Sequence, residues 1–226
     1  MAKPWLSEDE SRRVAEAVAA AEANTSGEIV TIVADRSDGY TEIALIWAVL
    51  VAFAAIAVLA IWPDFYLGLV DRVTGKWNAE WTPRGILGLA LFVGIVKFVA
   101  TWLIQLWQPL KFLLIPGPVK SARAHHRAVA FFRVGAERRT TGRTGILIYL
   151  SMREHRAEIV ADEAIASRVD PHVWGKAMEA MLHHIKRGEV GEGMASAVSE
   201  VGQVLAVHAP RLADDRNELP DRPIEV

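Results

Sequence analysis

Two long apolar stretches constrain this chain of 226 residues more than any other feature. Residues 43–62 carry no charge, and residues 85–107 carry only Lys97. A helix rises about 1.5 Å per residue, so roughly 20 apolar residues are needed to cross the hydrocarbon core of a bilayer. A domain of this size has no interior that could bury two such helices. We therefore predict an integral membrane protein with two spans.

The rest of the sequence has the composition of an ordinary folded domain. Hydrophobic residues make up 52% of the chain and charged residues 23%, which implies that the excess hydrophobicity is concentrated in the two stretches. The net charge of -2 gives no reason to expect a nucleic-acid partner. The absence of cysteine excludes disulfides, thiolate catalysis and cysteine-ligated metal centres. The polar N-terminus lacks the features of a signal peptide, so the first span is expected to direct insertion.

The distribution of basic residues predicts the orientation of the two spans. Only Arg72, Lys76 and Arg84 lie in the loop that connects them. Many more follow the second span: Lys111, Lys120, Arg123, Arg127, Arg133, Arg138, Arg139 and Arg143. Because basic residues accumulate on the cytoplasmic side of membrane helices, both flanks of the hairpin should be cytoplasmic.

Four residues within the spans are candidates for contacts in the membrane. Ala44, Ala48 and Ala52 recur at every fourth position, which gives a small-residue face for the second span or for another copy of the chain. A lysine is costly in lipid, so Lys97 should face water or a polar partner, or reach towards the membrane surface. If Lys97 serves an ion or substrate pathway, the chain is a component of a transport assembly.

The segment before the first span has the pattern of a helix followed by a strand. Ser7 and Glu10 form a capping-box signature, and the apolar residues that follow repeat with helical spacing. Residues 28–34 are rich in β-branched residues and predict a buried strand. One strand cannot make a sheet, so its partners must lie beyond the second span.

The segment after the second span supplies those partners. Residues 145–150 and 155–161 predict two strands with a short connection, hence an antiparallel pair. A helix over residues 119–139 would be the crossover that makes strands 28–34 and 145–150 parallel. Two further helices are expected, one after Asp170 and one over residues 191–208.

These elements predict one α/β domain, a small mixed sheet covered by helices, interrupted by a two-helix transmembrane hairpin. Its first part is residues 1–41 and its remainder is residues 111–210, with the hairpin at residues 42–110 and a tail at residues 211–226. The tail is rich in charged and turn-forming residues and is expected to be loosely attached.

The order of these elements, with the motifs RTGILIYLS and HRAEIVAD, resembles the TPM domain family. The motifs NTSGEIVTIVA and RNELPD resemble its membrane-embedded bacterial branch, which implies a bacterial inner membrane. Members of the wider family are similar to divalent-metal-binding acid phosphatases, and others, including thylakoid lumen proteins, act as assembly or repair factors for membrane complexes. The resemblance therefore implies the fold and leaves these activities as alternatives.

The family pattern has an Asp-Asn pair before the glycine that opens the second strand, whereas this chain has Arg143 and Thr144. The strand order should bring Glu28, Asp162 and Glu163 close to Arg143. These carboxylates could hold calcium or magnesium, whose bound water would attack a phosphate ester clamped by Arg143. Alternatively, Arg143 replaces the metal as counter-ion, and the group is a set of ion pairs.

The predicted helix over residues 119–139 is strongly basic and follows a membrane span, so it should attract anionic lipid headgroups. No two of the seven histidines are spaced i, i+4, which argues against a metal site made of histidines. The favoured function is an interaction or assembly module that is anchored in the membrane and binds a protein partner. A metal-dependent phosphatase and a transport component are the alternatives.

Overall fold

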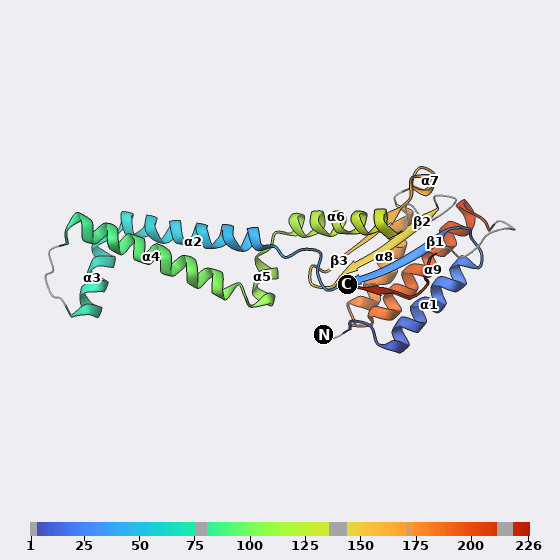
Figure 1. Cartoon of the computed structure of the whole chain (residues 1–226), viewed down its shortest axis with the longest axis horizontal. Coiled ribbons are helices and arrows are strands. Elements are labelled where there is room, and N and C mark those ends of the chain that lie inside the picture. The colour runs from blue at the N-terminus through green and yellow to red at the C-terminus, as the bar shows by residue number, and fades with distance from the viewer. Residues whose placement is uncertain (1–3, 76–80, 136–143, 171, 212–218) are drawn as a thin grey trace. The chain divides into compact units, whose positions relative to one another are not determined.

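A computed structural model of the chain describes residues 4–75, 81–135, 144–170, 172–211 and 219–226. The chain divides into two compact units, one made of Met1–Asp38 with Gly117–Val226 and the other of Gly39–Pro116. We name them the α/β unit and the hairpin unit; Figure 1 labels their elements. The predicted fold class is confirmed, because a mixed sheet is covered by helices and two apolar helices form the inserted hairpin.

The sheet of the α/β unit has four strands in the order β3-β2-β1-β4. They are β1 (Glu28–Ala34), β2 (Gly145–Ser151), β3 (Arg156–Ala161) and β4 (Ile224–Glu225). As predicted, β1 and β2 are parallel and β2 and β3 are antiparallel. The crossover between β1 and β2 contains α6 (Gly117–Gly135). Every residue of β1 and β2 is buried, as is typical of parallel strands that are covered on both faces.

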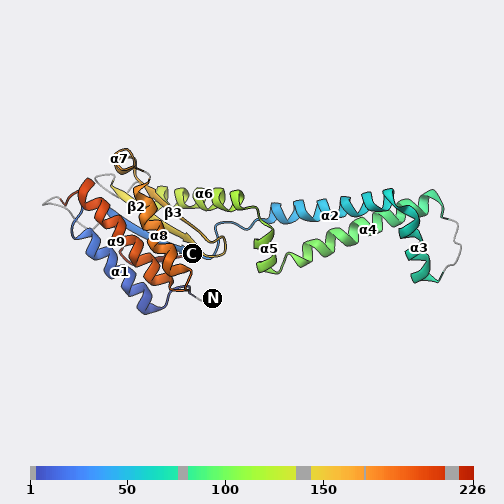
Figure 2. The same ribbon diagram turned by 180° about the vertical axis from the view of Figure 1, so that it is seen from behind.

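Helices cover both faces of this sheet. Figures 1 and 2 show α1 (Glu8–Glu22), α8 (Val173–Ile185) and α9 (Val190–His208) on one side and α6 on the other. The core on the first side includes Val14, Val18, Ile29, Ile146, Met181, Met194 and Val198. The core on the α6 side includes Ala124, Ala128, Phe132, Val30, Leu147 and Leu219. Alternation along the strands therefore divides the apolar side chains between two cores.

The capping box that opens α1 is present. The Ser7 hydroxyl accepts the Glu10 backbone N–H at 3.3 Å, and the Glu10 carboxylate accepts the Ser7 backbone N–H at 2.8 Å. The hydrogen bonds from the backbone and hydroxyl of Ser7 lower the pKa of Glu10. The capping box thereby satisfies two of the backbone donors at this helix start.

Glycines bring α9 close to its neighbours. Gly191 and Gly193 could be explained from the sequence as caps, but both lie within α9 at close packing positions. A Cβ on Gly191 would lie 2.5 Å from Glu10 Cβ, and one on Gly193 would lie 2.9 Å from the carbonyl oxygen of Met181. Near this junction Gly188, with φ of +82°, has the positive φ that favours glycine at a helix end.

The end of the chain differs from the loosely attached tail expected from its composition. Leu219 is buried in the core on the α6 side, and β4 pairs with β1. The backbone N–H of Val226 donates to Val33 O at 3.1 Å, and that of Asp35 donates to Val226 O at 2.9 Å. The expectation was wrong for residues 219–226 because the last apolar residues complete the edge of the sheet.

The hairpin unit contains four helices among its described residues: α2 (Thr41–Ile61), α3 (Pro63–Thr74), α4 (Pro83–Ile104) and α5 (Gln108–Leu114). The helices α2 and α4 are long and apolar enough to cross a membrane, close to the ranges predicted from the sequence. The second helix ends at Ile104, before the predicted residue 107, and a new helix, α5, begins at Gln108 with Pro109 in its first turn. Neither α3 nor α5 was expected.

The contact between α2 and α4 explains the small residues of α2. Ala44 and Ala48 are buried, and Ala52 is half-buried beside an apolar hollow that includes Gly94. A Cβ on Gly94 would lie 2.9 Å from the Ile56 side chain. The amide of Gln105 donates to Ala44 O at 3.0 Å and to Thr101 O at 3.1 Å. The small-residue face of α2 thus packs against the second apolar helix of the same chain.

Candidate functional site

Two of the predicted site residues lie on either side of Gly145 at one edge of the sheet. The register of β1 and β2 pairs Glu28 with Gly145. The backbone N–H of Asp162 donates to Gly145 O at 2.9 Å, directly after the last residue of β3. Strand alternation places Glu28 and Asp162 on the face that α6 covers. Because Gly145 has no side chain, the space between the two acidic positions is not filled from β2.

Both of these carboxylates are buried, and one has an unused oxygen. Glu28 is 5% exposed and its Oε2 accepts the Leu219 N–H at 3.2 Å. Asp162 is 6% exposed and its Oδ1 accepts the Glu163 N–H at 2.8 Å, at the start of α7 (Glu163–Ala166). Asp162 Oδ2 is buried and has no hydrogen-bond partner among the described residues. A buried carboxylate oxygen is costly without a partner, so Asp162 has spare capacity to bind a donor or a cation.

The other predicted members of the site are arranged differently. Glu163 is exposed, and Arg143 lies outside the described residues. Thr144 donates its hydroxyl to Ser26 O at 2.8 Å. Within the described residues, no group of three or more His, Cys, Asp or Glu side chains could hold a metal ion. Calcium takes about six to eight oxygen ligands, so the described side chains do not fit a divalent cation without further donors.

A second polar cluster lies at the opposite end of β1 and β2 and was not found from the sequence. Its centre is Glu154, which is 1% exposed and accepts the Ser151 hydroxyl and, at 2.7 Å, the Ser37 N–H. The Ser37 and Tyr149 hydroxyls are 3.0 Å apart. Burial raises the pKa of Tyr149, so its phenol remains a hydrogen-bond donor. The cluster joins the end of β1 to the β2–β3 connection.

Ion pairs surround this second cluster. Arg153 Nε lies 2.9 Å from Asp35 Oδ2, and Arg123 lies 3.1 Å from Asp38. Asp35 and Asp38 therefore stabilise the end of the chain segment that leads out of β1. Each of these partly exposed pairs contributes little to the stability of the fold, but together they hold the segment that follows β1 in place.

The basic helix α6 uses some of its charge within the α/β unit. Arg123 pairs with Asp38, and the Arg127 guanidinium lies 4.6 Å from the centre of the Phe131 ring. His125 Nδ1 lies 3.2 Å from a Glu158 oxygen. Arg133 is exposed, whereas Arg138 and Arg139 lie outside the described residues. Part of the positive charge of α6 is therefore engaged within the α/β unit.

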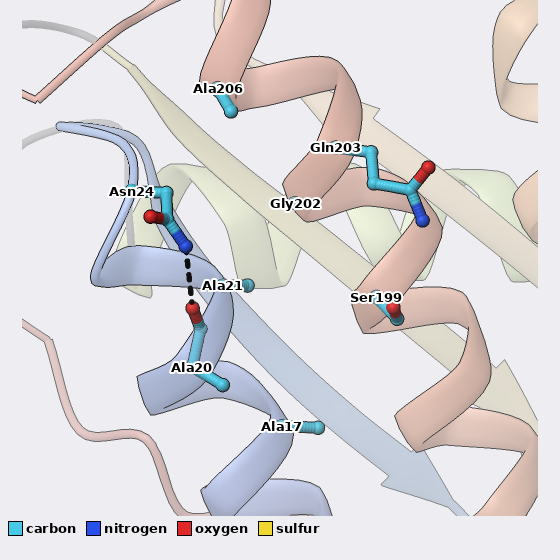
Figure 3. A pocket seen from close by; sticks show the side chains of 8 residues that line it. All are labelled: Ala17, Ala20, Ala21, Asn24, Ser199, Gly202, Gln203 and Ala206. Atoms are coloured by element: carbon cyan, nitrogen blue, oxygen red, sulfur yellow. Dashed lines mark hydrogen bonds between the residues drawn. The ribbon is translucent and has the colours of Figure 1, made fainter.

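A groove lies between α1 and α9 on the outer surface of their helical layer (Figure 3). It encloses about 320 Å³. Its walls are Ala17, Ala20, Ala21 and Asn24 on one side and Ser199, Gly202, Gln203 and Ala206 on the other. Both sets have the spacing i, i+3, i+4, i+7, so one continuous line of mostly small side chains borders each side. Asn24 Nδ2 donates to Ala20 O at 3.2 Å, which holds this side chain at the rim.

The surface of the hairpin unit is strongly apolar. In the most apolar 18-residue stretch of each helix, only 17% is buried in α2 and only 6% in α4. A core helix of a soluble protein would be mostly buried. The exposed side chains include Leu50, Phe53, Leu87, Leu91, Phe92 and Ile95. Lys97 is also exposed within this unit. An apolar surface of this extent indicates a membrane or a partner.

Comparisons with known proteins agree with this fold. Residues 121–204 match the model of the TPM domain. The NMR structure of the BA42 protein from the psychrophilic bacterium Bizionia argentinensis is similar, with a TM-score of 0.56 and 17% sequence identity over 100% of this chain and 99% of that one. The comparison with curated proteins found no match. The resemblance inferred from the sequence motifs is therefore confirmed over residues 121–204, which match the model of the TPM domain.

Proposed function

We propose that this chain is a TPM-domain protein anchored in the membrane, whose α/β unit is an interaction or assembly module. The outward apolar surface of α2 and α4 carries the proposal. Phe53 is 67% exposed and Leu91 is 64% exposed, near the middle of the two helices. In water such a surface would drive aggregation, whereas in a bilayer it meets acyl chains. The hairpin then anchors a domain whose two sequence segments lie on the same side of the membrane.

The basic residues support an orientation with this domain in the bacterial cytoplasm. Arg72 lies between α2 and α4, and Arg84 lies in the first turn of α4. Lys111 and the cations of α6 follow α4. This asymmetry agrees with the positive-inside rule. Arg133 and the arginines that follow it would also attract anionic headgroups of the inner leaflet.

The groove between α1 and α9 supports an interaction role. Its small walls allow close approach of another backbone, and their helical spacing matches the length of about two turns of a docked helix. The rim residues Asn24, Ser199 and Gln203 can hydrogen-bond to such a helix. We therefore assign the groove to a helix of a protein partner.

Filling the groove tests this assignment. Ala20 lines the groove and is exposed, so Ala20→Trp should block a docked helix without disturbing the core. Ala19 is also exposed but does not line the groove, and Ala19→Trp is the matched control. After purification from native membranes, we expect a stoichiometric protein partner to be reduced about tenfold or more by Ala20→Trp, because a lost contact of about 1.4 kcal/mol suffices.

Equal partner recovery with wild type, Ala19→Trp and Ala20→Trp would contradict the groove assignment. An equal loss with both variants would do the same, since it would show a general defect in the helix. The unfolding midpoint of both variants should match that of wild type.

A divalent-metal-dependent phosphatase is the second candidate, favoured by the unused buried oxygen of Asp162. In this alternative, Asp162 and Glu28 would supply carboxylate ligands, with further donors such as Glu163, and Arg143 would hold the phosphate. Calorimetric titration of calcium and magnesium into wild type and Asp162→Asn separates the candidates. Binding that Asp162→Asn abolishes would favour the phosphatase, and its absence would leave the interaction module.

A further inference from the structure

We propose that α3 lies in the plane of the membrane, in the headgroup layer at the end of the hairpin where α2 and α3 meet. This inference deepens the proposed function and rests on its membrane anchor. The chain between the two spans is then a second, interfacial attachment to the bilayer and not a simple aqueous loop.

The apolar side chains of α3 form an exposed stripe. Phe65 is 69%, Leu69 47% and Val73 80% exposed, and they recur at every fourth position. Neighbours at this spacing lie on one face of a helix. No residue of α3 is buried, so the described part of the chain leaves this stripe uncovered. Asp64 is also exposed and lies on the opposite side of the helix, whereas Arg72, seven residues after Phe65, borders the stripe.

The length and direction of α3 fit an in-plane helix. Its 12 residues extend for about 18 Å, which is too short to cross the hydrocarbon core. Pro63 occupies its first position, and Trp62 alone separates it from α2. Figures 1 and 2, which view the molecule from opposite sides, both show α3 running across the direction of α2. If α2 crosses the membrane, α3 therefore lies along its surface.

Lipid is the occupant that the surrounding residues favour. Ile61 and Trp62 are exposed at the end of α2 and extend its lipid-facing surface towards the stripe. Tryptophan at such a junction prefers the interface between headgroups and acyl chains. On the polar side, Asp71 accepts the Trp81 indole N–H at 3.4 Å, which ties α3 to the segment before α4. A short helix with one apolar and one charged face is typical of interfacial binding.

Spin labels can test this arrangement because the chain has no cysteine of its own. Single cysteines would replace Phe65, Leu69 and Val73 on the stripe and Asp64 on the opposite side. Each labelled protein is reconstituted into vesicles of phosphatidylethanolamine and phosphatidylglycerol. Collision of the label with oxygen, which concentrates in lipid, is compared with collision with a water-soluble nickel chelate. A label at Phe53 serves as the reference for the membrane core.

We expect the oxygen-to-nickel accessibility ratio to be several-fold higher at the three stripe positions than at Asp64, and highest at Phe53. If Phe53 is lipid-exposed while the stripe positions are as accessible to nickel as Asp64, the in-plane helix is overturned and the anchor stands. If both reagents are blocked at the stripe, a protein surface covers it, which also overturns the lipid assignment. If Phe53 itself is open to nickel, the membrane anchor fails.

Discussion

Replacing Leu91 with arginine is expected to prevent α4 from spanning the membrane in most molecules. Leu91 is exposed near the middle of α4, which already contains Lys97. An arginine in place of leucine at the centre of a span costs about 3 kcal/mol on insertion scales, or roughly a hundredfold in the insertion equilibrium. The central part of α2 carries no charge, whereas α4 contains Lys97. The free energy that favours membrane insertion is therefore smaller for α4 than for α2.

Glycosylation mapping in microsomes measures this effect. An acceptor site placed after residue 108 should stay unmodified in wild type, because two spans keep it on the outer side of the vesicle. It should be modified in Leu91→Arg, because a single span carries it into the lumen. Adding Lys97→Leu should restore the wild-type pattern, and Val207→Arg, at an exposed apolar position of α9, should not change it. Normal insertion of Leu91→Arg would show that lipid does not surround α4.

Alanine in place of Gly202 is expected to destabilise the α/β unit by about 1–3 kcal/mol. A Cβ at this position would lie 2.5 Å from Ala21 Cβ and 3.2 Å from Ala21 Cα, and the backbone atom cannot give way without separating α1 from α9. The free energy of unfolding in denaturant, followed by circular dichroism in detergent, measures the loss.

Gly175→Ala provides a control for which the opposite change in the free energy of unfolding is expected. Gly175 lies in α8, and a Cβ there would meet no atom within 4 Å. Because alanine loses less backbone entropy than glycine in a helix, this variant should be more stable than wild type by up to about 1 kcal/mol. A Gly202→Ala protein as stable as wild type would mean that α1 and α9 are not as closely packed as the structure has them.

The elements with strong local signals were predictable from the sequence. The β-branched run of β1 and the capping box of α1 need no distant partner to be recognised, and both appear as expected. The parallel pairing of β1 and β2 followed from the long crossover that contains α6, since a long crossover with a helix returns the chain to the same end of the sheet. This pairing is also what allowed Glu28 and Asp162 to be placed at the same edge.

The features that were missed depend on short segments or distant contacts. The two residues of β4 are too few to show a strand period, and their pairing is fixed by β1. The cluster at Glu154 needs Ser37, which is more than a hundred residues away in the sequence. The helix α3 was missed in the sequence because its apolar residues follow directly after the first span, and only Trp62 and Pro63 mark its start.

Labelling of single cysteines in intact bacterial cells tests the anchored arrangement most directly. Arg72 in the connection and Arg168 in the α/β unit are both exposed, and each would be replaced by cysteine in the otherwise cysteine-free chain. We predict that a membrane-impermeant maleimide modifies Arg72→Cys in intact cells and modifies Arg168→Cys only after the inner membrane is permeabilised. Equal labelling of the two positions in intact cells would contradict a hairpin that crosses the membrane.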